Sequence, residues 1–117
     1  MAQQPTLKLK LVMGEQHTLL GPGKIALLNA IASEHSLSKA AKSIGMSYRR
    51  AWLLIQELND SLKEPVLVTQ TGGQAGGGSV LTPMAFELIA LYEQLTKEAE
   101  AATGQTRDRI ASLIQSD

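Results

Sequence analysis

The sequence predicts a single domain that is mainly α-helical with a small β component, and three observations support this fold class. Its 117 residues are enough for one domain with a modest core and too few for two ordinary domains. Hydrophobic residues make up 44% of the chain but aromatic residues only 3%, which favours packed helices with a core of Leu, Ile, Ala and Val. The third observation is a glycine stretch between two short β-branched segments, which is typical of a β-hairpin. We therefore treat residues 1–117 as one domain.

The N-terminal part of the chain predicts an edge strand followed by a helix. Residues 7–13 have a period of two that predicts a half-buried strand whose lysines face outward: Leu7, Leu9, Leu11 and Met13 alternate with Lys8, Lys10 and Val12. The segment "LLGPGK" ends this strand, and Pro22 suits the first turn of a helix. Apolar residues then recur at helical spacing up to about His35, namely Ile25, Leu28, Ile31 and Ala32.

Residues 36–62 predict two helices joined by a tight turn. The suitable N-caps are Ser36 or Ser38 for the first helix and Ser47 for the second. Two helices that cross steeply need a small residue where they touch and a glycine where the backbone reverses, and Ala41 and Gly45 are placed for these tasks. Ile44 and Ala51 are expected to fill the angle between the helices.

The second of these helices has two different faces. The apolar face consists of Ala51, Ile55, Leu58 and Leu62, and the other face of Tyr48, Arg49, Trp52, Gln56 and Asn59. Trp52 fits two positions equally well. It is either a core side chain with a large apolar area or part of the edge of the exposed surface.

Residues 66–82 predict a β-hairpin, and residues 83–102 predict a long helix. The segments "VLVTQT" and "SVLT" are the strands on either side of the glycines. Thr82 is a good N-cap with Pro83 at the first helical position. A narrow apolar seam follows, comprising Met84, Leu88, Leu91 and Leu95, and the helix is expected to end at Gly104. Such a seam indicates a partner helix, and Ile110, Leu113 and Ile114 predict one further short helix.

The order of these elements is that of a winged helix-turn-helix domain. In such a domain the second helix of the turn enters the major groove of DNA and presents its N-terminal residues to base edges. Here those residues are "SYRRAW": Ser47 is suited to a phosphate, and Tyr48 to a phosphate or a thymine methyl group. Arg49 and Arg50 are each suited to a guanine edge or a phosphate, and the sequence does not distinguish them. The alternative is an ordinary solvated helix start with two surface arginines.

The stretch "TGGQAGGGSVLT" is interpreted as the wing. A P-loop requires G-x-x-x-x-G-K-[ST] and a dinucleotide site requires G-x-G-x-x-G before a helix, and neither pattern occurs here. In a wing, glycines let the backbone approach the sugar-phosphate chain closely. The expected wing contacts are Thr71, Gly72, Gly73, Gln74 and Ser79. The alternative is a hairpin that contacts nothing.

Composition and charge exclude several classes of protein. The chain has no cysteine, and His17 and His35 have no flanking carboxylate pattern, so neither a metal nor another cofactor is expected. No apolar run is long enough for a signal peptide or a membrane span, which predicts a cytoplasmic protein with no membrane partner. No nucleophile, base and orienting group stand together, so an enzyme is not expected.

The net charge is zero, but the charges are unevenly distributed. Residues 1–71 hold eight Lys or Arg against five Asp or Glu, whereas residues 72–117 hold three against six. This asymmetry indicates a basic face for a polyanion, and scattered surface charge is the alternative.

With these residues assembled, the chain resembles the DNA-binding domain of the molybdate-responsive transcriptional regulators called ModE. The resemblance runs from about residue 7 to residue 92 and depends on "GKIALLNAI", "SLSKAAKSIGMSYRRAW", "ELND", "GGQAGGGSVLT" and "ELIALY". It implies a DNA-reading unit that includes Ser38, Lys39, Ser47, Tyr48, Arg49 and Arg50, and a wing over residues 71–79. It also implies that the helix over residues 83–102 pairs with its copy in a homodimer.

The chain departs from the family pattern in two ways. Full-length members carry a C-terminal pair of molybdate-binding domains, which this sequence lacks, so molybdate is not expected to bind this chain. Ala85 and Phe86 stand where the family tends to have a glycine and a polar or basic residue, which predicts a difference in local dimer packing.

The leading hypothesis is a homodimeric, sequence-specific DNA-binding transcriptional regulator that binds double-stranded DNA and has no effector domain. Trp52 and Gln56 are included in its DNA-facing surface, and Leu88, Leu91 and Leu95 in its dimer seam. The alternative is a protein-interaction module that dimerises with, or modulates, a larger regulator through that seam.

Overall fold

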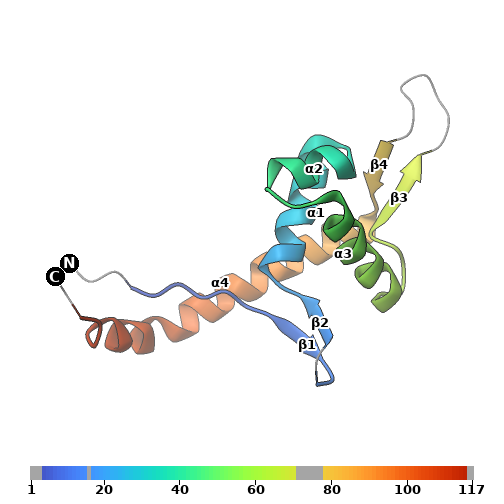
Figure 1. Ribbon diagram of the computed structural model, residues 1–117. Coiled ribbons are helices and arrows are strands. Elements are labelled where there is room, and N and C mark those ends of the chain that lie inside the picture. The colour runs from blue at the N-terminus through green and yellow to red at the C-terminus, as the bar shows by residue number, and fades with distance from the viewer. Residues whose placement is uncertain (1–3, 16, 71–77, 116–117) are drawn as a thin grey trace.

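Four helices and two small antiparallel hairpins make up the part of the chain that the structure, a computed structural model, describes, namely residues 4–15, 17–70 and 78–115. In chain order the elements are β1 (Leu11–Met13), β2 (His17–Leu20), α1 (Pro22–Glu34), α2 (Leu37–Ser43), α3 (Tyr48–Ser61), β3 (Leu67–Gln70), β4 (Gly78–Leu81) and α4 (Pro83–Ala111). Helices α1 to α3 and hairpin β3–β4 form a packed body around the start of α4, and the rest of α4 projects away from it (Figure 1). The mainly α fold class with a winged helix-turn-helix order is confirmed.

The helix starts lie where the sequence predicts them. The hydroxyl of Ser36 accepts a hydrogen bond from the amide of Lys39, that of Ser47 from Arg50, and that of Thr82 from Ala85. These contacts satisfy amides that have no partner within the helix. Of the two candidate caps for α2, the structure uses Ser36.

The turn between α2 and α3 also has the predicted glycine. Gly45 adopts φ +70°, a left-handed conformation that costs a residue with a side chain about 1–2 kcal/mol. Ala41 and Ala51 are completely buried where α2 meets α3, as expected. The expectation for Ile44 is wrong, because this C-cap residue is 38% exposed and Met46 packs against the core instead.

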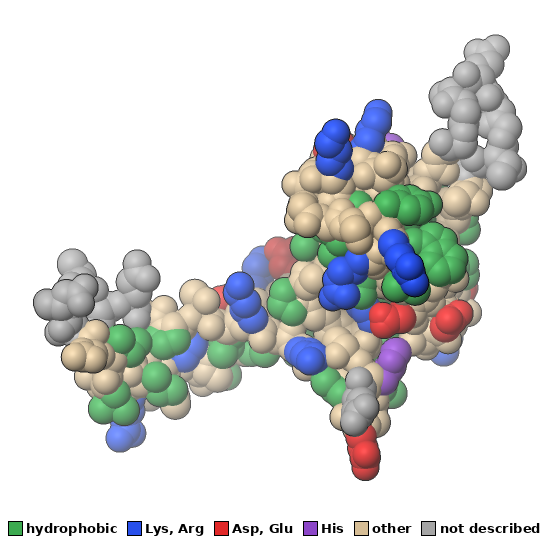
Figure 2. Space-filling view, in the orientation of Figure 1, with side chains coloured by type: hydrophobic (Ala, Val, Ile, Leu, Met, Phe, Trp, Pro, Cys, Tyr) green, Lys and Arg blue, Asp and Glu red, His purple; other side chains and the backbone are tan. Residues whose placement is uncertain are grey.

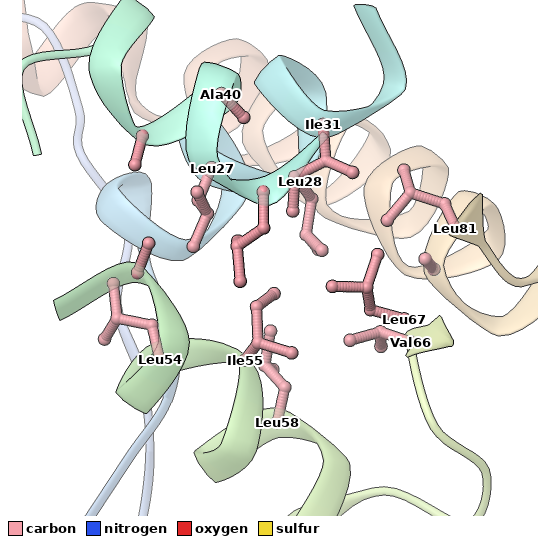
Figure 3. Close-up of a cluster of buried hydrophobic side chains, with 14 of the residues drawn as sticks. Leu27, Leu28, Ile31, Ala40, Leu54, Ile55, Leu58, Val66, Leu67 and Leu81 are labelled. Carbon is pink, nitrogen blue, oxygen red and sulfur yellow. The ribbon is translucent and has the colours of Figure 1, made fainter. Parts of the chain in front are cut away.

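The core lies between α1, α3 and the wing strands. Figure 3 shows Leu27, Leu28 and Ile31 of α1 directed toward Leu54, Ile55 and Leu58 of α3, with Val66, Leu67 and Leu81 closing the cluster. Leu54 was not assigned to the buried face by the sequence, yet it is 8% exposed. This core fixes where α3 lies relative to the rest of the body.

The hairpin β3–β4 pairs in the predicted region. Its register joins Leu67 to Leu81 and Gln70 to Gly78. The hydroxyl of Thr82 donates to the carbonyl of Pro65 over 2.6 Å, which ties the base of the hairpin to the start of α4. The hairpin is therefore anchored at both the core and α4.

The predicted strand over residues 7–13 is wrong in length, and no partner was predicted for it. Only Leu11–Met13 forms a strand, and it pairs with β2, which the sequence analysis did not predict. The preceding residues run extended along α4, where the hydroxyl of Tyr92 donates to the carbonyl of Leu9 over 2.6 Å. The alternation is real, with Leu7 and Leu9 half-buried, but it reports packing on a helix instead of strand pairing.

The predicted end of the long helix at Gly104 is also wrong. Helix α4 continues through Gly104 to Ala111 and includes Ile110, whereas Leu113 and Ile114 follow it in a turn, so the separate short helix expected there does not form. A glycine inside a helix costs only about 1 kcal/mol relative to alanine, so the helical turns on either side of Gly104 continue through it.

Within the described residues, no helix is long and apolar enough to cross a membrane.

Candidate nucleic-acid interface

The N-terminal turn of α3 is exposed while the opposite side of the same helix is buried. Ala51, Ile55 and Leu58 point into the core, whereas Tyr48, Arg49 and Arg50 are exposed. The helix therefore presents its first turn to solvent on a rigid support.

The positions on α3 fall into three sides because an α-helix turns about 100° per residue. Arg49 and Leu53 lie opposite the buried side and point outward. Tyr48, Trp52 and Asn59 lie on the flank that faces the wing strands. Arg50, Leu54 and Glu57 lie on the other flank, which faces the β2–α1 corner. The two adjacent arginines thus point in different directions, Arg49 outward and Arg50 toward the β2–α1 corner. The sequence alone did not distinguish them.

The flank toward the wing carries an aromatic surface. Tyr48 and Trp52 line a groove of about 400 Å³ together with Gln56, Val68 and Ser79. Trp52 is 46% exposed, so of its two predicted positions the core is wrong and the exposed surface is right. The groove connects α3 to both strands of the hairpin.

Basic side chains accompany this surface on α2 and α3. Ser38 and Lys39 are exposed in the first turn of α2, and Lys42 is exposed one turn later. Figure 2 shows Lys and Arg side chains at the top of the body, where α2 lies, and lower, beside the hydrophobic patch next to the wing strands. The predicted residues of α2 and α3 therefore share one side of the molecule.

The wing residues are only partly described. Ser79 lies on β4 and lines the groove beside Trp52. Thr71, Gly72, Gly73 and Gln74 lie outside the described residues.

The predicted dimer seam on α4 is divided between the interior and the surface. Leu88 packs against the core of its own chain, whereas Leu91 is 54% exposed and Leu95 is half-buried. Ala85 is completely buried at the base of the hairpin, and its neighbour Phe86 is exposed.

The described residues contain no cluster of metal-ligating side chains. No three His, Asp or Glu side chains there come close enough together to hold a metal ion. Nε2 of His17 is hydrogen-bonded to the hydroxyl of Ser61, the last residue of α3, over 3.0 Å.

The packing of α2 on α3, the exposed basic first turn of α3 and the adjacent two-stranded wing define a winged helix-turn-helix domain of the DNA-binding regulator class. The model of the bacterial regulatory helix-turn-helix proteins of the lysR family matches residues 23–85, more than half of the chain. The chain belongs to this family.

Individual relatives agree with the predicted resemblance to ModE regulators, which is confirmed. The chain is 43% identical over 98 residues to the DNA-binding transcriptional dual regulator ModE of Escherichia coli K12, covering 83% of this chain and 35% of the relative. It is 35% identical over 100 residues to the molybdenum transport protein ModE of Azotobacter vinelandii, and the match covers 86% of this chain and 37% of that relative. It is 47% identical over 73 residues to the molybdenum-pterin-binding protein MopB of Rhodobacter capsulatus, and the match covers 62% of this chain and 27% of that relative. The chain thus spans between about a quarter and two fifths of these relatives.

Proposed function

We propose that this chain binds double-stranded DNA sequence-specifically, as a homodimer of winged helix-turn-helix domains, and thereby regulates transcription. The observation that carries the proposal is the first turn of α3, which is exposed and basic and is held rigidly by the buried Ala51 and Leu58 behind it. A recognition helix of this kind presents its N-terminal side chains to base edges in the major groove.

The directions of the side chains suggest separate roles. Arg49 points straight outward and is assigned to a base edge, where a bidentate contact to guanine is the commonest specific contact. Gln56 and Trp52 are assigned to the base pairs nearer the wing, and Tyr48 to a backbone phosphate or a thymine methyl group. Ser38, Lys39 and Ser47 are assigned to phosphates, as are wing residues Thr71, Gly72, Gly73, Gln74 and Ser79.

Dimerisation is assigned to α4. Because Leu88 already packs against its own core, the contact between copies would depend mainly on Leu91 and Leu95. Two recognition helices in successive major grooves would be about 34 Å apart on a palindromic site.

Binding to DNA is tested by fluorescence anisotropy with a duplex from the gene's own upstream region and a random duplex of equal length. Arg49→Gln should weaken binding to the specific duplex by about 1–3 kcal/mol and reduce the preference over random DNA. Arg109→Gln, on exposed α4, removes the same charge and serves as the control. Equal affinity for both duplexes, unchanged by Arg49→Gln, would contradict the proposal.

Dimerisation is tested separately by analytical ultracentrifugation. Leu91→Glu should shift the chain toward monomer, whereas Ala90→Glu, one residue earlier on an exposed face, should not. A wild-type chain that remains monomeric at all concentrations would contradict the homodimer.

A second candidate is a protein-interaction module, which the exposed Leu91, Ile110 and Leu113 on and after α4 favour. It predicts a complex with protein that is insensitive to salt, whereas DNA binding through phosphates falls steeply with salt. In both cases we assign no catalytic role and no molybdate site to this domain, and we propose that it acts in the cytoplasm.

A further inference from the structure

The flank of α3 that faces away from the wing contains a basic cavity that no assigned role explains. The cavity has a volume of about 400 Å³ and lies between the β1–β2 hairpin, the start of α1 and α3. Three cationic side chains line it, Lys10, Lys24 and Arg50, against the single carboxylate of Glu57. Two positive charges are therefore in excess.

Lys24 is the most unusual of these residues because its charge is buried. It is 5% exposed, and its ammonium donates to the carbonyl of Thr18 over 2.6 Å and to that of Leu19 over 3.2 Å. Within the described part of the chain, no carboxylate forms an ion pair with it. A buried charge without a counter-charge is costly unless an opposite charge reaches it, which favours an anion in the cavity beside it.

The other two cations lie at the accessible edge of the cavity. Lys10 is exposed, and its aliphatic stem lies over the start of α1, where a Cβ added to Gly21 would meet Lys10 Cγ at 3.8 Å. Arg50 reaches the cavity from the first turn of α3. Among the described residues, neither cation forms an ion pair, so both are free to contact a ligand.

The position of the cavity on α3 identifies the source of the anion. The major groove is about 12 Å wide and a helix with its side chains is about 10–12 Å across, so each flank of a recognition helix faces one strand's phosphates. The wing lies toward one flank and this cavity toward the other. The cavity is therefore next to the DNA strand that the wing does not reach.

We propose that this cavity is a phosphate-binding site that holds a backbone phosphate of DNA through Lys10 and Arg50, with the buried charge of Lys24 beneath it. The inference rests on the proposed DNA binding, and it adds the β1–β2 hairpin and the start of α1 to the interface. The wing and the cavity then hold the two strands on opposite sides of α3.

The first experiment compares two lysines on the same segment. Lys10→Gln should weaken binding about threefold to fivefold, as expected for an exposed charge pair, and equally on specific and random duplexes. It should also lower the slope of log affinity against log salt concentration by about one. Lys8→Gln, two residues away and outside the cavity, is the matched control and should change neither quantity by as much.

The second experiment removes the phosphate charge instead. Neutral methylphosphonates are placed one at a time along the strand that flanks α3 opposite the wing. One position should weaken wild-type binding and have no further effect on Lys10→Gln, since the two partners of one contact are not additive. If wild type binds DNA while Lys10→Gln behaves like Lys8→Gln and no such position exists, the backbone site is overturned and the proposed function stands.

The third experiment uses inorganic phosphate, at constant ionic strength, to separate a free anion from the DNA backbone. A chemical-shift change at the amide of Lys24 in wild type, absent in the Lys10→Gln/Arg50→Gln variant, would support the site even if the chain fails to bind DNA. If wild type binds neither duplex DNA nor phosphate at this position, the proposed function and the cavity site are both overturned.

Discussion

The packed body and the projecting half of α4 are stabilised in different ways. In the body, Leu27, Leu28 and Leu58 are completely buried and contact elements distant in sequence. Beyond Tyr92, the only buried residue of α4 is Ala111, and side chains such as Ile110 are about half-exposed. That half is joined instead to residues 4–5, through hydrogen bonds from Arg107 to Gln4 Oε1 over 2.6 Å and to the carbonyl of Pro5 over 3.2 Å.

This difference suits the two tasks that the proposed function assigns to α3 and α4. A helix that reads DNA must be held to a fraction of an ångström, and burial on many sides does this for α3. In the proposed dimer, α4 would need apolar surface that is available to a second copy, and exposed side chains such as Leu91 and Ile110 provide it. Mutations should therefore act globally in the body and locally on α4.

The largest effect is expected from Leu58→Ala in the core. The residue is completely buried, so its loss leaves a cavity and should lower the free energy of unfolding by about 2–5 kcal/mol. Leu53→Ala, on the exposed side of the same helix, should cost less than about 1 kcal/mol. Chemical denaturation followed by circular dichroism measures both, and similar losses would contradict the division of α3 into buried and exposed sides.

The next effect is expected from Gly45→Ala in the turn between α2 and α3. The space around Gly45 is open, so the cost of about 1–2 kcal/mol comes from its φ of +70° alone. Gly23→Ala is the control, because Gly23 lies in the first turn of α1 without a positive φ or a neighbour within 4 Å. Thermal unfolding measures the change in stability of each variant relative to wild type, and the two changes should differ in sign or clearly in size. A Gly45→Ala variant as stable as wild type would contradict the strained turn.

The starts of the elements and the helix-turn-helix were predictable because their signals are local. Ser47, Thr82 and Pro83 act within three residues of their own positions, and Gly45 acts on its own backbone. The same local logic failed at Gly104, because the helix on both sides outweighs the cost of one glycine. It also failed for β2, because this strand has only four residues and forms by pairing with Leu11–Met13, which is not a local signal.

The candidate interface was predictable in its residues but not in its geometry. The sequence identifies Arg49 and Arg50 as one basic pair, and only the contacts of α3 with the wing and with α1 separate them. Lys24 carried no signal, because a lysine in the first turn of a helix resembles any surface residue until the chain folds over it. Trp52 likewise fitted both the core and the exposed surface, because only the folded chain shows which side of α3 is buried.

A smaller effect, of opposite sign, is expected from Gly104→Ala in the projecting half. A Cβ there would meet nothing within 4 Å, and alanine should stabilise the helix by about 0.5–1 kcal/mol. Thermal unfolding at fixed protein concentration measures the gain. A loss of stability that grows with protein concentration would instead indicate that a second copy packs closely against Gly104.

The smallest global effect is expected from Arg107→Ala, although its local effect should be clear. The guanidinium joins residues 4–5 to α4 and also donates to the carbonyl of Glu100 over 2.7 Å. Because these contacts lie outside the body, the free energy of unfolding should change by only about 0.5 kcal/mol or less.

The local change is measured by trypsin cleavage after Lys8 and Lys10, which lie on the segment that Arg107 holds. Cleavage there should accelerate about threefold to tenfold, which corresponds to roughly 1 kcal/mol for the net loss of hydrogen bonding. Arg109→Ala, which removes a neighbouring arginine that makes no described contact with that segment, is the control. Equal cleavage of the two variants would mean that the other contacts with α4 hold the segment without Arg107. These are the hydrogen bonds from Gln4 Nε2 to the carbonyl of Gly104 and to Asp108 Oδ1, the bond from Tyr92 to Leu9, and the packing of Leu7 and Leu9.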